Sequence, residues 1–114
     1  MASNSYETGR AAEEWAAQYL QAQGYQILAR NFRSKAGEID LVARLGPTLV
    51  FLEIKGSLRQ PRVEAVQPRQ IQRVRRAAQE FLLRQRLPQE SLMRFDVLLV
   101  WGPPYQVSHL PDAF

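Results

Sequence analysis

Three charged residues in the middle of the chain have the types and spacing to act together on one substrate. Glu53 and Lys55 lie two residues apart near the end of an otherwise apolar run at residues 48–55. In a β-strand, residues two apart point to the same face. Asp40 lies in the preceding alternating segment, residues 38–44, and a short Gly-Pro turn makes the two segments antiparallel neighbours. This pairing predicts that Asp40 lies beside Glu53.

Two adjacent carboxylates repel each other unless a cation lies between them. Mg²⁺ or Mn²⁺ fits such a pair, because these hard ions prefer oxygen ligands. A water on such an ion could attack a phosphodiester, and the ion would offset the negative charge of the transition state. Lys55 would orient that water or stabilise the reacting phosphate. The competing interpretation is a structural ion pair between Glu53 and Lys55.

Seven elements that position these residues are predicted in the order α-β-β-β-α-β-β. Apolar periodicity predicts helices over residues 8–23 and 67–86, and alternating or apolar runs predict strands at residues 25–31, 38–44, 48–55, 94–101 and 105–110. Residues 56–65 contain Gly, Ser and Pro without periodicity and predict a loop. Alternation places Ile39, Leu41 and Ala43 on one face of their strand. This order predicts an α/β fold in which helices flank a central mixed sheet.

Two polar residues on the predicted helices could complete the site. Glu13 lies on the flank of the apolar stripe of the first helix, from where it could reach the edge of the sheet. Gln70 lies on the inner side of the second helix together with Val74. Each also has a simpler interpretation. A carboxylate near a helix N-terminus is favoured there in any case, and a glutamine can bond a nearby backbone group.

Positive charge is concentrated in one segment of the chain. Residues 59–86 hold eight arginines and two acids, a local charge of +6, whereas the whole chain carries +4. Nucleic acid is the natural partner of such a segment, and a solvated helix face is the alternative. Arg59 and Arg62, on the loop after the Glu53–Lys55 strand, are expected to contact phosphates, as are Arg69 and Arg73. Arg69 and Arg73 are expected on the opposite side of their helix from Gln70.

The composition limits the class of protein. A length of 114 residues fits a single domain over residues 1–114. The absence of cysteine excludes disulfides and zinc–thiolate sites, and neither a signal peptide nor a membrane-spanning run is recognisable. A cytoplasmic protein with no membrane partner is expected. His109, the only histidine, is interpreted as structural rather than as a metal ligand.

The motifs taken together resemble the YraN family, small bacterial proteins described as proposed endonucleases. The resemblance covers nearly the whole chain in order, through Gly9-Arg10-x-x-Glu13, Gly24-Tyr25, Arg30-Asn31-x-Arg33, Gly37-Glu38-Ile39-Asp40-Leu41, Phe51-x-Glu53-x-Lys55, Arg94-Phe95-Asp96-Val97 and Ala113-Phe114. That family belongs to the restriction-endonuclease-like superfamily, in which an acid on one strand is followed by (D/E)-x-K on the next. Archaeal Holliday-junction resolvases are among its relatives.

The resemblance implies a role for each residue singled out above. Asp40 and Glu53 would be metal ligands, Glu13 would complete the metal site, Lys55 would be the catalytic lysine and Gln70 would lie close by. The implied function is metal-dependent hydrolysis of DNA, at branched or damaged sites, for which a homodimer would be suitable. The alternatives are a nucleic-acid-binding domain that keeps the fold without cutting, and a scaffold protein in which Glu53 and Lys55 form a structural pair.

Overall fold

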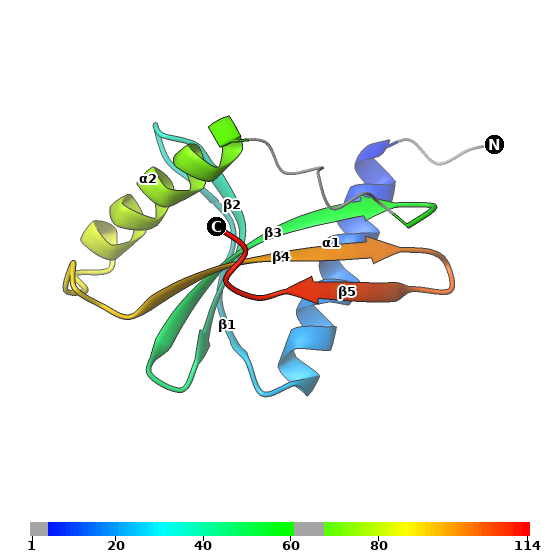
Figure 1. The fold of residues 1–114 in the computed structure, drawn as a ribbon, viewed down its shortest axis with the longest axis horizontal. Coiled ribbons are helices and arrows are strands. Elements are labelled where there is room, and N and C mark those ends of the chain that lie inside the picture. The colour runs from blue at the N-terminus through cyan, green and yellow to red at the C-terminus, as the bar shows by residue number, and fades with distance from the viewer. Residues whose placement is uncertain (1–4, 61–67) are drawn as a thin grey trace.

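In the part of the chain that the structure describes, five strands and two helices follow one another in the predicted order. The computed structural model describes residues 5–60 and 68–114. The elements are α1 (Ser5–Ala22), β1 (Gln26–Arg33), β2 (Glu38–Leu45), β3 (Thr48–Ser57), α2 (Pro68–Arg84), β4 (Met93–Trp101) and β5 (Gln106–Leu110). The strands form one sheet in the order β1-β2-β3-β4-β5 (Figure 1). Only β3 and β4 run parallel within this sheet, so the predicted mixed sheet is confirmed.

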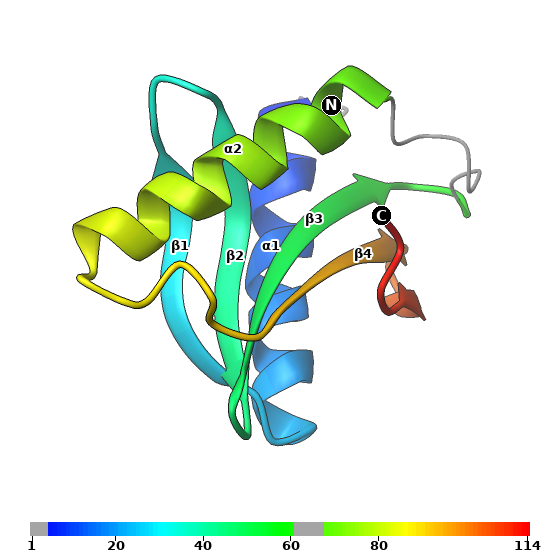
Figure 2. The same cartoon turned by 60° about the vertical axis from the view of Figure 1, so that its left-hand side comes forward.

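The two helices cover opposite faces of the sheet. Figure 2 shows α2 crossing in front of β1 and β2, with α1 behind them. The sheet therefore buries two apolar clusters. The cluster beneath α1 joins Ala12, Ala16 and Leu20 to Leu41, Leu52 and Leu98. The cluster beneath α2 joins Val74, Ala78 and Phe81 to Val42, Leu49 and Phe51. Burial on both faces explains the continuous apolar run of β3.

The helices begin and end where local chemistry allows. The apolar residues of α1 recur at helical spacing, so one stripe of the helix packs on the sheet. Gly24 ends this segment with a φ of 95°, a conformation that glycine adopts without steric cost. The backbone N–H of Tyr25 then donates to the carbonyl oxygen of Leu20 at 3.0 Å. Neither helix of the described ranges is long and apolar enough to cross a membrane.

Two sequence-based expectations about the strands were wrong. Ile39 packs with Val42 beneath α2, whereas Leu41 and Ala43 pack beneath α1. A regular strand would put Ile39 with Leu41, so the alternation is interrupted between them. In addition, β3 continues to Ser57, because it pairs with parallel β4 beyond the end of the apolar run. The expected loop therefore begins later, and residues 61–67 lie outside the described residues.

The turn between β1 and β2 packs closely against α2. Ser34 stabilises the turn, since its Oγ accepts hydrogen bonds from the backbone N–H groups of Ala36 and Gly37 at 3.0 and 3.2 Å. A Cβ atom built on Gly37 would lie 3.0 Å from the Cβ of Arg73, closer than ordinary van der Waals contact. Glycine at this position therefore lets the turn approach the first half of α2.

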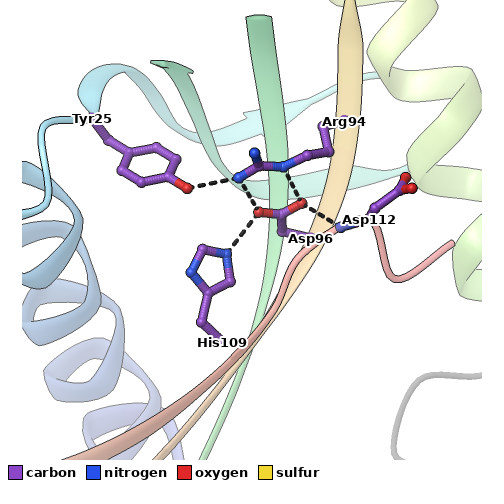
Figure 3. Close-up of polar contacts among 5 residues, drawn as sticks. All are labelled: Tyr25, Arg94, Asp96, His109 and Asp112. Carbon is purple, nitrogen blue, oxygen red and sulfur yellow. Dashed lines mark hydrogen bonds and ion pairs between the residues drawn. The ribbon is translucent and has the colours of Figure 1, made fainter. Parts of the chain in front are cut away.

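A buried polar network fastens the C-terminal segment to β4 (Figure 3). The fully buried Asp96 accepts hydrogen bonds from Arg94 Nε at 2.9 Å and Arg94 Nη2 at 2.7 Å. His109 Nε2 lies 2.7 Å from Asp96 Oδ2, and the backbone N–H of Asp112 donates to Oδ1 at 2.9 Å. Arg94 also donates to the hydroxyl of Tyr25 at 2.6 Å. These contacts agree with the structural role expected of His109.

The network favours the ionised form of Asp96. Burial opposes ionisation, but the hydrogen bonds from His109, Arg94 and the Asp112 backbone outweigh it and lower the pKa of Asp96 to about 2. A carboxylate whose pKa is lower in the folded protein stabilises the fold above its ordinary pKa, and this stabilisation disappears as the pH falls through the folded value. For Asp96 the loss should therefore occur between about pH 4 and pH 2.

The Asp96→Asn substitution should destabilise the protein in a pH-dependent way. At pH 7 it should lower the free energy of unfolding by about 3 kcal/mol, because Arg94 loses its buried partner. The difference in the free energy of unfolding between the wild type and the variant should shrink by roughly 2 kcal/mol as the pH falls from 4 to 2. Urea unfolding across this pH range measures both values. Asp112→Asn, which keeps the backbone N–H, is the control and should change little. A constant difference at all pH values would contradict the proposed ionisation.

Candidate functional site

Asp40 lies where β2 separates from β3. The pairing between these strands runs from Leu45 opposite Thr48 to Leu41 opposite Leu52. One position further along β2, the carboxylate of Asp40 takes the place of a backbone acceptor. Its Oδ2 accepts a hydrogen bond from the backbone N–H of Ile54 at 2.8 Å. This contact coincides with the break in alternation after Ile39. It also places Asp40 next to Glu53 in the register, so the predicted proximity of the two acids is confirmed.

Glu53, Lys55 and Gln70 are joined by hydrogen bonds. Glu53 lies near the end of the apolar part of β3 and is only 4% exposed. Gln70, in the first turn of α2, donates through Nε2 to Glu53 Oε2 and accepts through Oε1 from Lys55 Nζ at 3.1 Å. Among the described residues, no ion pair joins Glu53 to Lys55 directly. Glu53 and Lys55 therefore do not form the simple structural salt bridge of the alternative interpretation. The amide group of Gln70 lies between the two side chains instead.

The two acids of this cluster resist ionisation. Burial raises the pKa of Glu53, and the neighbouring charge of Asp40 raises it further, to about 8, although Lys55 and Gln70 oppose the shift. Burial also raises the pKa of Asp40, against the opposing effects of the Ile54 N–H and Lys55. The surrounding protein thus does not compensate the negative charge that both carboxylates would carry when ionised. A cation placed between the carboxylates would remove this imbalance.

Glu13 lies in the same region but outside this pair. It is half-buried on α1, and its pKa is raised by burial and then by Asp40, while a hydrogen bond with Asn31 opposes the shift. Within residues 5–60 and 68–114, no three histidine, cysteine or acidic side chains are already arranged to hold a metal ion. A metal ion held by Asp40, Glu53 and Glu13 together would therefore require these side chains to move closer to one another.

Two hollows meet at Asp40. The first, of about 810 Å³, lies between α1 and the edge of the sheet and is lined by Glu13, Arg30 and Asn31 among others. The second, of about 770 Å³, lies between the β1–β2 turn and α2 and is lined by Glu53 and Gln70. Arg33, Glu38 and Asp40 line both hollows. Asp40 is therefore reached from both hollows, whereas Glu53 lines only the second.

The predicted phosphate-binding arginines are distributed unequally around the site. Arg69 and Arg73 line the second hollow together with Gln70, so placing them on the opposite side of α2 was wrong. Arg73 follows Gln70 by three residues, so helical geometry already puts the two side chains on one face of α2. The contact of the β1–β2 turn at Gly37 with Arg73 shows that this face looks toward the edge of the sheet. Arg59 is exposed and lines neither hollow, and Arg62 lies outside the described residues.

Sequence reasoning missed two residues at the centre of the site. Arg33 and Glu38 face each other across the β1–β2 turn as a register pair, and Arg33 Nε lies 3.4 Å from Glu38 Oε1. Their equal spacing from residues 34–37, which form the turn, was the available signal. Because Glu38 lies two residues before Asp40, this signal would have placed Arg33 near the acidic pair as well.

Comparison with known proteins places the chain in one family. The family model of the Uncharacterised protein family UPF0102 matches residues 12–100. A UPF0102 protein of Rhodopseudomonas palustris is 43% identical over 112 residues, which are 96% of this chain and 85% of the relative. One of Frankia casuarinae is 44% identical over 112 residues, or 93% and 94% of the two chains. One of Alkaliphilus oremlandii is 37% identical over 113 residues, or 93% and 96%.

The names of these relatives state a family and no activity. The matched region contains Asp40, Glu53, Lys55 and Gln70, so the whole hydrogen-bonded cluster belongs to the shared part of the chain. Since the family model covers most of the chain and the relatives align with nearly all of it, the chain belongs to the UPF0102 family, the YraN family that its motifs resemble.

Proposed function

We propose that this protein is an endonuclease that uses a divalent metal ion to hydrolyse phosphodiester bonds in DNA. The observation that carries the proposal is the cluster of Asp40, Glu53 and Lys55, in which one buried carboxylate, one partly buried carboxylate and one ammonium group adjoin a hollow lined by arginines. Such a cluster offers oxygen ligands for a hard cation and a positive charge beside the place where a phosphate would react.

The donor atoms suit Mg²⁺ or Mn²⁺. The Ile54 N–H engages only Oδ2 of Asp40, and Gln70 engages only Oε2 of Glu53. Among the described residues, the other oxygen of each carboxylate accepts no hydrogen bond, so each acid keeps one oxygen for an ion. Asp40 and Glu53 would hold the ion, with Glu13 as a third ligand. When bound, the ion would supply an activated water and stabilise negative charge on the phosphate.

The chain's own residues would position the reactants. Gln70 holds the ammonium of Lys55 at 3.1 Å and also bonds Glu53, so it fixes both side chains relative to each other. The Nζ of Lys55 would then offset charge that develops on the phosphate oxygens. Arg69 and Arg73, which line the same hollow, would hold phosphates next to the bond that is cut.

A nucleic-acid-binding domain without catalysis is the second candidate. One observation favours it. Gln70 forms hydrogen bonds with both Glu53 and Lys55, so these two side chains have a protein partner without an ion. This alternative predicts DNA binding that depends on salt concentration and is indifferent to removal of the Asp40 charge. Cleavage assays separate the two candidates. A panel of substrates also tests for activity on branched DNA, and the oligomeric state of the bound protein tests for a homodimer.

The Lys55→Ala and Asp40→Asn variants should each lose at least about 100-fold in cleavage rate. The first loses the charge that stabilises the transition state, and the second loses a metal ligand. The measurement is cleavage of junction, flap, nicked and linear DNAs with Mg²⁺ or Mn²⁺, with the oligomeric state of the bound protein followed by light scattering. Lys35→Ala removes an exposed lysine in the β1–β2 turn and should cut like the wild type.

The pattern of losses decides between the candidates. Absence of cleavage by the wild type on every substrate and with both ions, together with salt-sensitive binding, would favour the non-catalytic domain. Cleavage that survives both substitutions would show that another part of the molecule, or a contaminant, cuts the DNA.

The Gln70→Ala variant should cleave about 10-fold more slowly while binding DNA nearly as well as the wild type. Groups that orient a metal ligand typically contribute 10- to 100-fold to affinity or rate, and Gln70 orients both Glu53 and Lys55. Single-turnover rates and binding constants measure the two effects separately. Gln72→Ala, an exposed glutamine on the same helix, is the matched control. A variant with unchanged cleavage would remove Gln70 from the site.

A further inference from the structure

The hollow beside α1 carries positive charge that the basic segment at residues 59–86 does not account for. Arg30 and Arg33 line this hollow, and both belong to β1. Arg30 pairs with Glu14 at 2.5 Å, and Arg33 pairs with Glu38 at 3.4 Å. The second hollow is lined by Arg69 and Arg73 of α2. Arginines therefore lie on both sides of Asp40, on elements that come from distant parts of the sequence.

Arg33 holds a special place between these arginines. It lines both hollows, as Asp40 does, so it adjoins the point where a strand crossing from one hollow to the other would pass the acidic pair. Its side chain is 77% exposed, and the side chain of its partner Glu38 is 61% exposed. An ion pair this exposed contributes little free energy, so a phosphate could replace Glu38 at small cost.

The described residues that line the two hollows include equal numbers of arginines and acids. Among the described residues that line them, five arginines (Arg10, Arg30, Arg33, Arg69 and Arg73) face five acids (Glu13, Glu14, Glu38, Asp40 and Glu53). A polyanion is therefore not strongly attracted by the hollows alone. A divalent ion between Asp40 and Glu53 would add positive charge where the two hollows meet.

We infer that the two hollows form one track for a nucleic-acid strand, that Arg33 contacts the phosphate where the strand passes Asp40, and that a divalent ion strengthens this binding. The inference rests on the proposed function, because the ion and the strand are those of the proposed reaction. It extends the interface to β1 and the α1 side of the sheet, and it requires nucleotides on both sides of the bond that is cut. Binding of the ion and binding of the strand are then coupled, each favouring the other.

The experiment measures binding rather than cleavage. The anisotropy of fluorescent single-stranded and duplex oligonucleotides is followed over a range of salt concentrations, with Ca²⁺ or with EDTA. The wild type should bind more tightly with Ca²⁺. Arg33→Ala should bind about 10-fold more weakly, and the slope of log K against log salt should fall by about 1, as expected for one lost phosphate contact.

Two further variants separate a phosphate contact from damage to the fold. Glu38→Gln removes the acid that competes for Arg33, so it should bind more tightly than the wild type, which a misfolded protein would not do. Arg44→Ala removes an exposed arginine of β2 that lines neither hollow, and it should bind like the wild type.

The outcomes distinguish this inference from the proposed function. If the wild type binds and Arg73→Ala weakens binding, while Arg33→Ala and Glu38→Gln change nothing, the strand contacts only the α2 side and the track is wrong. Binding that is equal in Ca²⁺ and EDTA would overturn the coupling to the ion. If the wild type binds neither oligonucleotide under any condition, both the track and the proposed function fail.

Discussion

The hydrogen bond from the Ile54 backbone N–H to the carboxylate of Asp40 is the contact on which the site depends. It forms at the point where β2 stops pairing with β3, and a side chain there takes the position of a backbone acceptor. A buried N–H without a partner would cost free energy, so the sheet can open at this point only because Asp40 supplies one. The opening in turn places the two hollows on either side of Asp40.

Among the described residues, two buried acids have surroundings with opposite effects on their pKa values. Asp96 and Glu53 are both almost completely buried, which by itself raises the pKa of each. Asp96 receives hydrogen bonds from Arg94, His109 and a backbone N–H, and its pKa falls to about 2. Glu53 has another acid as a neighbour, and its pKa rises to about 8. The first arrangement stabilises the fold, whereas the second opposes ionisation of Glu53, and strongly shifted pKa values of this kind are typical of functional sites.

The approach of α2 to the sheet connects the fold to the site. Gly37 permits close contact between the β1–β2 turn and Arg73, and one helical turn earlier Gln70 reaches Glu53 and Lys55. The apolar cluster beneath α2 fixes the position of the helix, because Val74 and Phe81 pack on β2 and β3. The position of Gln70 is thus determined by packing on one side and by a glycine on the other, so small changes in either should alter the site.

Local patterns in the sequence were enough for the order of the elements, the mixed sheet and the nearness of Asp40 to Glu53. These follow from periodicities of two and 3.6 residues and from the turn between two strands, which neighbouring residues encode. Tertiary structure alone decided that Ile39 changes faces, that the β1–β2 turn approaches Arg73, and that Tyr25, Arg94 and His109 meet around Asp96. Each of these depends on contacts between segments far apart in the chain, whose energies no local pattern records.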